Sequence, residues 1–208
     1  MIYSMFKKIY IFILPLICGI AYGNDCIKYK HIPNVSISSP IHENRIVQPD
    51  EPMDKLHGNV LATLIQDFDL VVDIIMHEGG YCVVLKKVDA TVGYNDFLVS
   101  IDKSHRKGSC TYSAIINHEK KHVDAYLSVI NDMKSDIQDS VFNAANSVMP
   151  VFVDSREKID SVIENMNYGI QSHPEVILIK QKINAAQEIR NKRVDQNEDN
   201  TELNICLS

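Results

Sequence analysis

A long helical pattern in the second half of the sequence restricts what this chain can fold into. Apolar residues recur at steps of three and four from Ile115 to Val141, and Met149-Pro150 then ends the run. This spacing gives a helix one apolar face, which must be buried against another element. The segments before Cys110 carry a different pattern, so we expect this helix to pack against β-structure.

Two β-rich runs precede the helix, from Tyr81 to Val92 and from Asp96 to Asp102. Between them, Gly93-Tyr94-Asn95 predicts a hairpin turn. The run from Leu56 to Met76 fits either a helix or a buried strand, because its apolar residues follow neither period cleanly. The half of the chain before Cys110 is therefore expected to be β-rich.

Further helical stretches follow the long helix, one starting near Ser155 and another after Pro174. We therefore expect an α+β fold in a single domain over residues 24–208. Its expected parts are a β-rich part (24–109), a helical part (110–194) and a polar tail (195–208).

The first 23 residues are typical of an export signal. Lys7 and Lys8 precede the apolar run 9–20, and Ala21-Tyr22-Gly23 places small residues where a signal peptidase recognises them. About a dozen apolar residues is short of the ~20 that a spanning helix needs, so we expect cleavage after Gly23 and no membrane anchor afterwards. The protein is then secreted or periplasmic. Its formal charge of −6 argues against holding nucleic acid by its overall field.

The cysteines agree with an exported protein. Of five cysteines, Cys18 leaves with the signal, and four remain: Cys26, Cys82, Cys110 and Cys206. An even number in an exported chain favours two disulfides, for which three pairings exist. No two of the four are close enough in sequence to form a CxxC metal half-site.

Residues 118–122, His-Glu-Lys-Lys-His, lie within the long helix and match the pattern HExxH. Two histidines four residues apart lie about 40° apart around a helix, so both imidazoles can reach one metal ion. Glu119 falls near the centre of the apolar face, where an unpaired carboxylate is costly. We therefore predict a Zn²⁺ site with His118 and His122 as ligands and Glu119 as the general base that activates water.

These residues also follow the spacing of a known family. The matching residues are Cys110-Thr111-Tyr112, Ile115, His118-Glu119, His122 and Val123, and, near the end, Arg190-Asn191, Val194-Asp195 and Cys206. On them the chain resembles the predicted secreted zinc-dependent proteases of proteobacteria, over about residues 81–206. More widely it is similar to zincins, in which an edge strand above the active-site helix binds peptide in extended form. The resemblance implies a zinc peptidase whose ligands include His118 and His122.

A third metal ligand must come from elsewhere in the chain. Position 128 is Ser, which excludes the metzincin pattern HExxHxxGxxH, so we expect the ligand on a later helix, as in gluzincins. If the segments on either side of Met149-Pro150 pack antiparallel, residue 120 faces about residue 183. Glu188 is then the nearest carboxylate in level and is the predicted third ligand; Asp195 and Glu164 are the alternatives.

The expected function is that of a zinc-dependent endopeptidase acting on peptide or protein substrates. A second electrophile for the oxyanion would come from Tyr168, His105 or His173, which qualify by residue type only. Two other functions remain open, namely hydrolysis of cell-wall peptides and a non-catalytic, disulfide-stapled interaction role. The sequence indicates neither a side-chain preference nor an oligomeric state.

Overall fold

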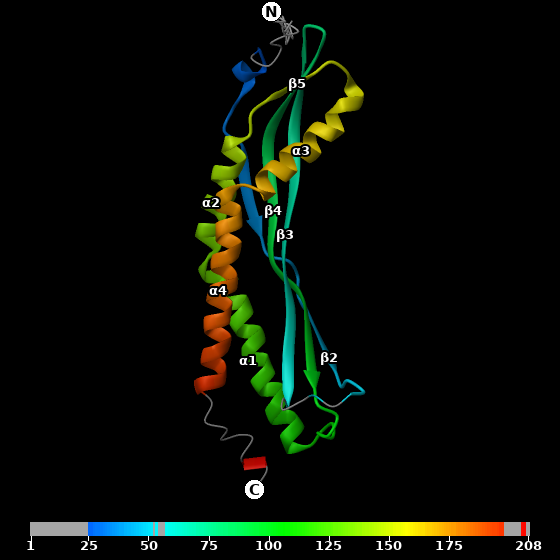
Figure 1. Cartoon of the computed structure of the whole chain (residues 1–208), viewed down its shortest axis with the longest axis vertical. Coiled ribbons are helices and arrows are strands. Elements are labelled where there is room, and N and C mark those ends of the chain that lie inside the picture. Colours follow the sequence, from blue (N-terminus) through cyan, green and yellow to red (C-terminus); the bar gives the residue numbers. More distant parts are fainter. Residues whose placement is uncertain (1–24, 52, 54–56, 198–204, 207–208) are drawn as a thin grey trace, which may run out of the picture.

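The computed structural model describes residues 25–51, 53, 57–197 and 205–206. The predicted signal peptide, residues 1–23, lies outside the described residues. The described part is α+β, as predicted, with a five-stranded mixed sheet, four of whose strands come from the first half of the chain, and long helices from the second half (Figure 1).

Two long antiparallel strands, β3 (Gly58–His77) and β4 (Gly80–Ile101), form the centre of the sheet. They are joined through Gly79, whose φ of 75° is a conformation that glycine adopts without steric cost. Of the two interpretations of residues 56–76, the strand is therefore confirmed.

The predicted hairpin at Gly93-Tyr94-Asn95 is wrong, because β4 passes straight through these residues. The pairing moves from Ala62–Phe97 to Leu64–Tyr94, so β4 contributes one extra residue and forms a β-bulge. Gly93 lies beside this bulge with φ 152°, which a side chain would disfavour. A glycine within a β-rich run here marks a bulge and not a turn.

The other three strands pair in succession along the second edge of β4. β5 (Val151–Val153) is antiparallel to it, whereas β1 (Asn34–Ser38) and β2 (Glu43–Val47) are parallel. β3 pairs only with β4, so its outer edge has no strand partner within the part of the chain that the structure describes.

Four long helices follow β4 along the chain, with β5 between the second and the third. They are α1 (Cys110–Asp132), α2 (Lys134–Ser147), α3 (Ile159–Gln171) and α4 (Pro174–Asn197), with short 3-10 turns at Asp25–Tyr29 and Arg156–Lys158. The helix expected from Ile115 to Val141 is thus interrupted at Met133. Figure 1 shows α4 running beside α2 and then α1, while α3 crosses over β3 and β4.

The loop between β4 and α1 is organised by Asp102. Its carboxylate accepts hydrogen bonds from the backbone N–H groups of Ser104 (2.8 Å) and Met53 (2.7 Å), and bonds from these two residues lower the pKa of Asp102 to about 2. Ser109 then caps α1, since its hydroxyl accepts from the Tyr112 N–H at 3.1 Å. The first turn of α1 is therefore fixed relative to the end of β4.

The apolar face of α1 packs on β4. The ring of Tyr126 lies edge-on to Tyr94 and Phe97, with centroid distances of 4.9 and 5.8 Å. Phe97 is fully buried, and burial of one phenylalanine contributes roughly 2–3 kcal/mol. This packing fixes the rotation of α1 about its own axis, and hence the direction in which its histidines point.

Two disulfides close the fold, Cys26–Cys82 and Cys110–Cys206, with Cα–Cα distances of 5.5 and 5.4 Å. The first joins the N-terminal 3-10 turn to the start of β4, and the second joins the first residue of α1 to the segment after α4. Disulfides persist in oxidising compartments, so this pair indicates a location outside the cytoplasm. Among the described residues, no helix combines the length and the apolar character needed to cross a membrane.

Candidate metal centre

α1 presents His118 and His122 on the face that it turns towards α4. The two Nε2 atoms lie 3.1 Å apart, and the ring centroids lie 4.8 Å apart with the planes nearly perpendicular. Both side chains are partly buried, with exposed fractions of 28% for His118 and 12% for His122. Side chains four residues apart on a helix share a face, which explains the convergence of the two rings.

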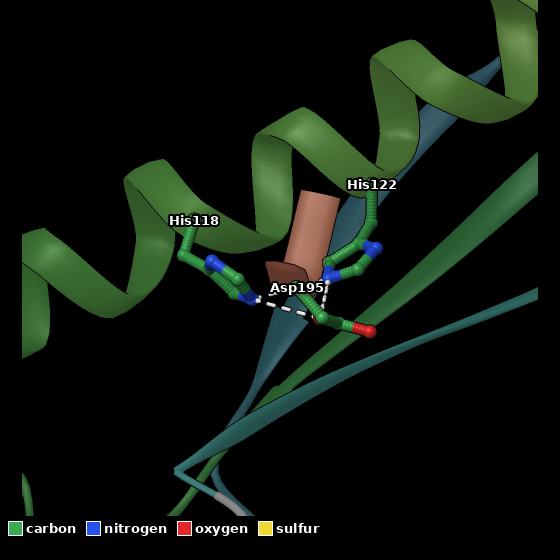
Figure 2. A group of neighbouring side chains, drawn as sticks. All are labelled: His118, His122 and Asp195. Atoms are coloured by element: carbon green, nitrogen blue, oxygen red, sulfur yellow. Dashed lines mark hydrogen bonds and ion pairs between the residues drawn. The ribbon is translucent and has the colours of Figure 1, made fainter. Parts of the chain in front are cut away.

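α4 supplies a carboxylate to the same point. Asp195 Oδ1 lies 3.1 Å from His122 Nε2 and 3.5 Å from His118 Nε2 (Figure 2). The three residues are a group that could hold a metal ion, and their metal-binding atoms lie within 4.8 Å of one another. The candidate metal centre is therefore built from two helices, with two ligands on α1 and one on α4.

Arg190 fixes the register between these helices. Its guanidinium donates to Ser128 Oγ and to the Asp132 carboxylate of α1, each at 2.5 Å. A charge-assisted pair of this kind is directional as well as stabilising. Because Arg190 lies five residues before Asp195 on α4, this clamp holds Asp195 at the level of the two histidines.

The spacing of the three atoms fits zinc. Zinc–ligand distances of about 2.0–2.1 Å in a tetrahedral site place neighbouring ligand atoms about 3.3–3.4 Å apart. The observed separations of 3.1, 3.1 and 3.5 Å lie on either side of that value. Two imidazoles and one carboxylate are also a donor set that catalytic zinc sites use, with the fourth position left for water or substrate. The 60% exposure of the Asp195 side chain leaves the centre open to solvent on that side.

Asp195, an alternative in the sequence analysis, is the carboxylate that lies beside the histidines. Glu188 is seven residues earlier on α4, about 10 Å along the helix, and its side chain is exposed. Glu164 is an exposed residue of α3. Neither belongs to the group that converges on His118 and His122.

Glu119 follows His118 on α1, and its carboxylate lies beside the first residue of β3. It is 4% exposed, as its place in the apolar stripe predicted. Its carboxylate lies against Gly58, the first residue of β3, where a Cβ added to Gly58 would come within 2.9 Å of the carboxyl carbon. The general-base candidate is thus held between α1 and the start of the edge strand.

The three candidates for a second electrophile lie in different places. Tyr168, near the end of α3, is 72% exposed, and His173 immediately precedes α4. The length of α4 separates His173 from Asp195 by about 30 Å, so neither residue serves the candidate metal centre. His105 lies in the loop before α1, and its Nε2 is 3.0 Å from Nδ1 of His57, the residue that precedes Gly58.

Sequence reasoning overlooked Asn191 as a member of the site. Its Oδ1 lies 3.2 Å from His122 Nδ1, on the opposite side of the ring from the converging Nε2 atoms. The available signal was its spacing, since Asn191 and Asp195 are four residues apart on α4 and so share a face.

No family model, curated protein or solved structure matches this chain. The interpretation of the site therefore rests on its own geometry.

Proposed function

We propose that this chain is an exported zinc-dependent endopeptidase in which His118, His122 and Asp195 hold the metal and Glu119 is the general base. The observation that carries the proposal is the convergence of two imidazoles and one carboxylate at zinc-ligand spacing. The histidines belong to an HExxH helix, the setting in which metallopeptidases place two ligands and a base.

Bound zinc would supply a Lewis acid and make water a nucleophile near neutral pH. Glu119 would accept the proton of that water and pass it to the departing amine. The two helices keep the ligands in place throughout, so no large movement is needed between steps.

We propose that a peptide substrate binds along the outer edge of β3, which has no strand partner among the described residues. An extended peptide can add to a free strand edge through main-chain hydrogen bonds. The side chain of Asn167 in α3 donates to the Phe68 carbonyl at 3.0 Å, which occupies one position of the strand. We therefore propose that the substrate lies along residues 58–67, the part of β3 that begins beside the Glu119 carboxylate.

Metal content tests the centre directly. The exported protein, purified with both disulfides formed, is expected to carry about one zinc per chain, and the His118→Ala/His122→Ala variant close to none. Asp195→Ala should weaken zinc binding strongly, whereas Glu188→Ala, a matched loss of a carboxylate from the same helix, should retain the parental metal content. Equal zinc loss in the Asp195 and Glu188 variants, or a folded parent without zinc, would contradict the proposed ligand set.

Hydrolysis tests the base. Glu119→Gln should keep zinc and lose cleavage of a peptide library, because the amide cannot accept the proton. Cleavage of cell-wall peptides alone would indicate that the substrate is a component of the cell envelope. A zinc-loaded parent that cleaves neither type of peptide would favour an interaction protein with a structural metal.

A further inference from the structure

We propose that Asn191 is a positioning residue of the candidate metal centre, which holds His122 in the tautomer that directs a free Nε2 towards the metal. This inference rests on the proposed zinc site, and it assigns a role to a residue that does not itself contact the metal.

The contact with His122 determines where the imidazole proton lies. Asn191 Oδ1 is 3.2 Å from His122 Nδ1, and an amide oxygen can only accept a hydrogen bond. Nδ1 must therefore carry the proton, which leaves the lone pair of a neutral ring on Nε2. Nε2 is the atom that lies 3.1 Å from both His118 Nε2 and Asp195 Oδ1.

This arrangement favours a cation at the point of convergence. A neutral His122 with its proton on Nδ1 presents the Nε2 lone pair towards the Asp195 oxygen, 3.1 Å away. A metal ion at this point would be bound by both atoms. Metal-binding histidines commonly donate their second N–H to an oxygen, which fixes the tautomer and the orientation of the ring.

The other end of the Asn191 amide is anchored to the core. The Asn191 side chain hydrogen-bonds the hydroxyl of Tyr126, and since its oxygen faces His122, its NH₂ group faces Tyr126. Burial raises the pKa of Tyr126, and this hydrogen bond opposes the effect. Tyr126 is held by edge-on contacts with Tyr94 and Phe97 of β4. Successive contacts therefore connect β4 to the His122 imidazole through Tyr126 and the Asn191 amide.

Each of the two helices contributes a pair of residues that lie four positions apart. α1 contributes the histidines at positions 118 and 122, and α4 contributes Asn191 and Asp195 at the same separation of four residues. Because the helices run antiparallel, Asp195 reaches both rings while Asn191 reaches the far side of His122. One helix thus supplies both a ligand and the group that orients a second ligand.

The test compares Asn191→Leu with Asn191→Asp. Leucine is nearly isosteric but accepts no hydrogen bond, so the zinc dissociation constant, measured by competition with a chelator, should rise roughly ten- to a hundredfold. Aspartate still accepts from Nδ1, so Asn191→Asp should bind zinc at least as tightly as the parent. Asn184→Leu, at an exposed asparagine of the same helix, is the matched control and should leave zinc affinity unchanged.

A spectroscopic measurement separates positioning from general stability. The visible spectrum of the Co²⁺-loaded protein reports ligand geometry; it should change in Asn191→Leu and be retained in Asn191→Asp. Parental zinc affinity and cobalt spectrum in folded Asn191→Leu would overturn the inference, and so would equal zinc losses in the two Asn191 variants. Failure of the parent itself to bind zinc would instead refute the proposed function.

Discussion

Gly58 lies directly against the carboxylate of Glu119, and this contact allows the role of Glu119 to be tested without changing its chemistry. A Cβ at Gly58 would lie 2.9 Å from the Glu119 carboxyl carbon, closer still to Oε1, and 2.8 Å from Ile115 Cγ2. Gly58 does not have a positive φ, so alanine is compatible with its backbone. In Gly58→Ala the new methyl group therefore displaces the Glu119 carboxylate, and Ile115 Cγ2 with it.

The size of the displacement follows from these distances. Ordinary van der Waals contact begins at 3.4 Å, so the carboxyl carbon must retreat by at least 3.4 − 2.9 = 0.5 Å, and Oε1 by more. A misplacement of about 1 Å at a reacting group costs on the order of a hundredfold in rate. We expect Gly58→Ala to lower kcat for peptide cleavage roughly ten- to a hundredfold. Overpacking should also cost about 1–3 kcal/mol of stability.

Zinc content and hydrolysis are measured on the same preparations. His118 and His122 converge on Asp195 of α4, and no residue of β3 belongs to this group, so Gly58→Ala should keep its zinc while it loses activity. Gly169→Ala is the control, because a Cβ there meets nothing within 4 Å, and it should be fully active. A folded, zinc-loaded Gly58→Ala protein with the parental rate would refute the placement of Glu119 at the chemistry. Loss of zinc along with activity would show that the change does not act through the carboxylate alone.

Two further predictions concern stability. Replacing Cys110 and Cys206 together by serine should lower the free energy of unfolding by up to about 4–5 kcal/mol, from the loop-entropy estimate for a separation of 96 residues, and should also weaken zinc binding. The Cys26→Ser/Cys82→Ser variant should lose similar stability but keep its zinc, and equal zinc loss in both would contradict this. Asp102→Asn should lower Tm at neutral pH, since the pKa of Asp102 is about 2 when folded against 3.8 in the unfolded chain; its contribution is present above pH ~4 and is lost as the pH falls through about 2. Thermal melts at pH 7 and pH 2 check this, and a Tm difference that persists unchanged at pH 2 would contradict it.

Local patterns were sufficient to predict the elements that need no long-range information. The apolar stripe after Cys110 predicted a helix, and the same stripe correctly placed Glu119 among buried residues. The division of the chain into a β-rich and a helical half follows from periodicity, which each segment carries by itself. The number of disulfides was predicted from cysteine counting, whereas their pairing depends on the fold and was not predictable.

Which carboxylate lies beside the histidines depends on the register between α1 and α4, and sequence periodicity does not carry this information. Antiparallel packing of the segments on either side of Met149-Pro150 would set residue 120 opposite about residue 183. In the structure, β5 and α3 lie between that turn and α4, and α3 packs across the sheet. α4 therefore begins only at Pro174, and residue 120 lies opposite about residue 193, a shift of nearly three turns. Because of this shift, Asp195 and not Glu188 lies at the level of the two histidines.

The order in which the chain is made has a consequence for when the candidate metal centre can form. His118 and His122 emerge early, whereas Asn191 and Asp195 lie on the last long helix described, and Cys206 follows both. If the chain is exported from its N-terminus, as proposed, the two histidines cross the membrane before Asp195 does. The bond between Cys110 and Cys206 can close only after that, and only where thiols are oxidised. On the proposed function, the peptidase is inactive in transit and becomes competent after it has arrived.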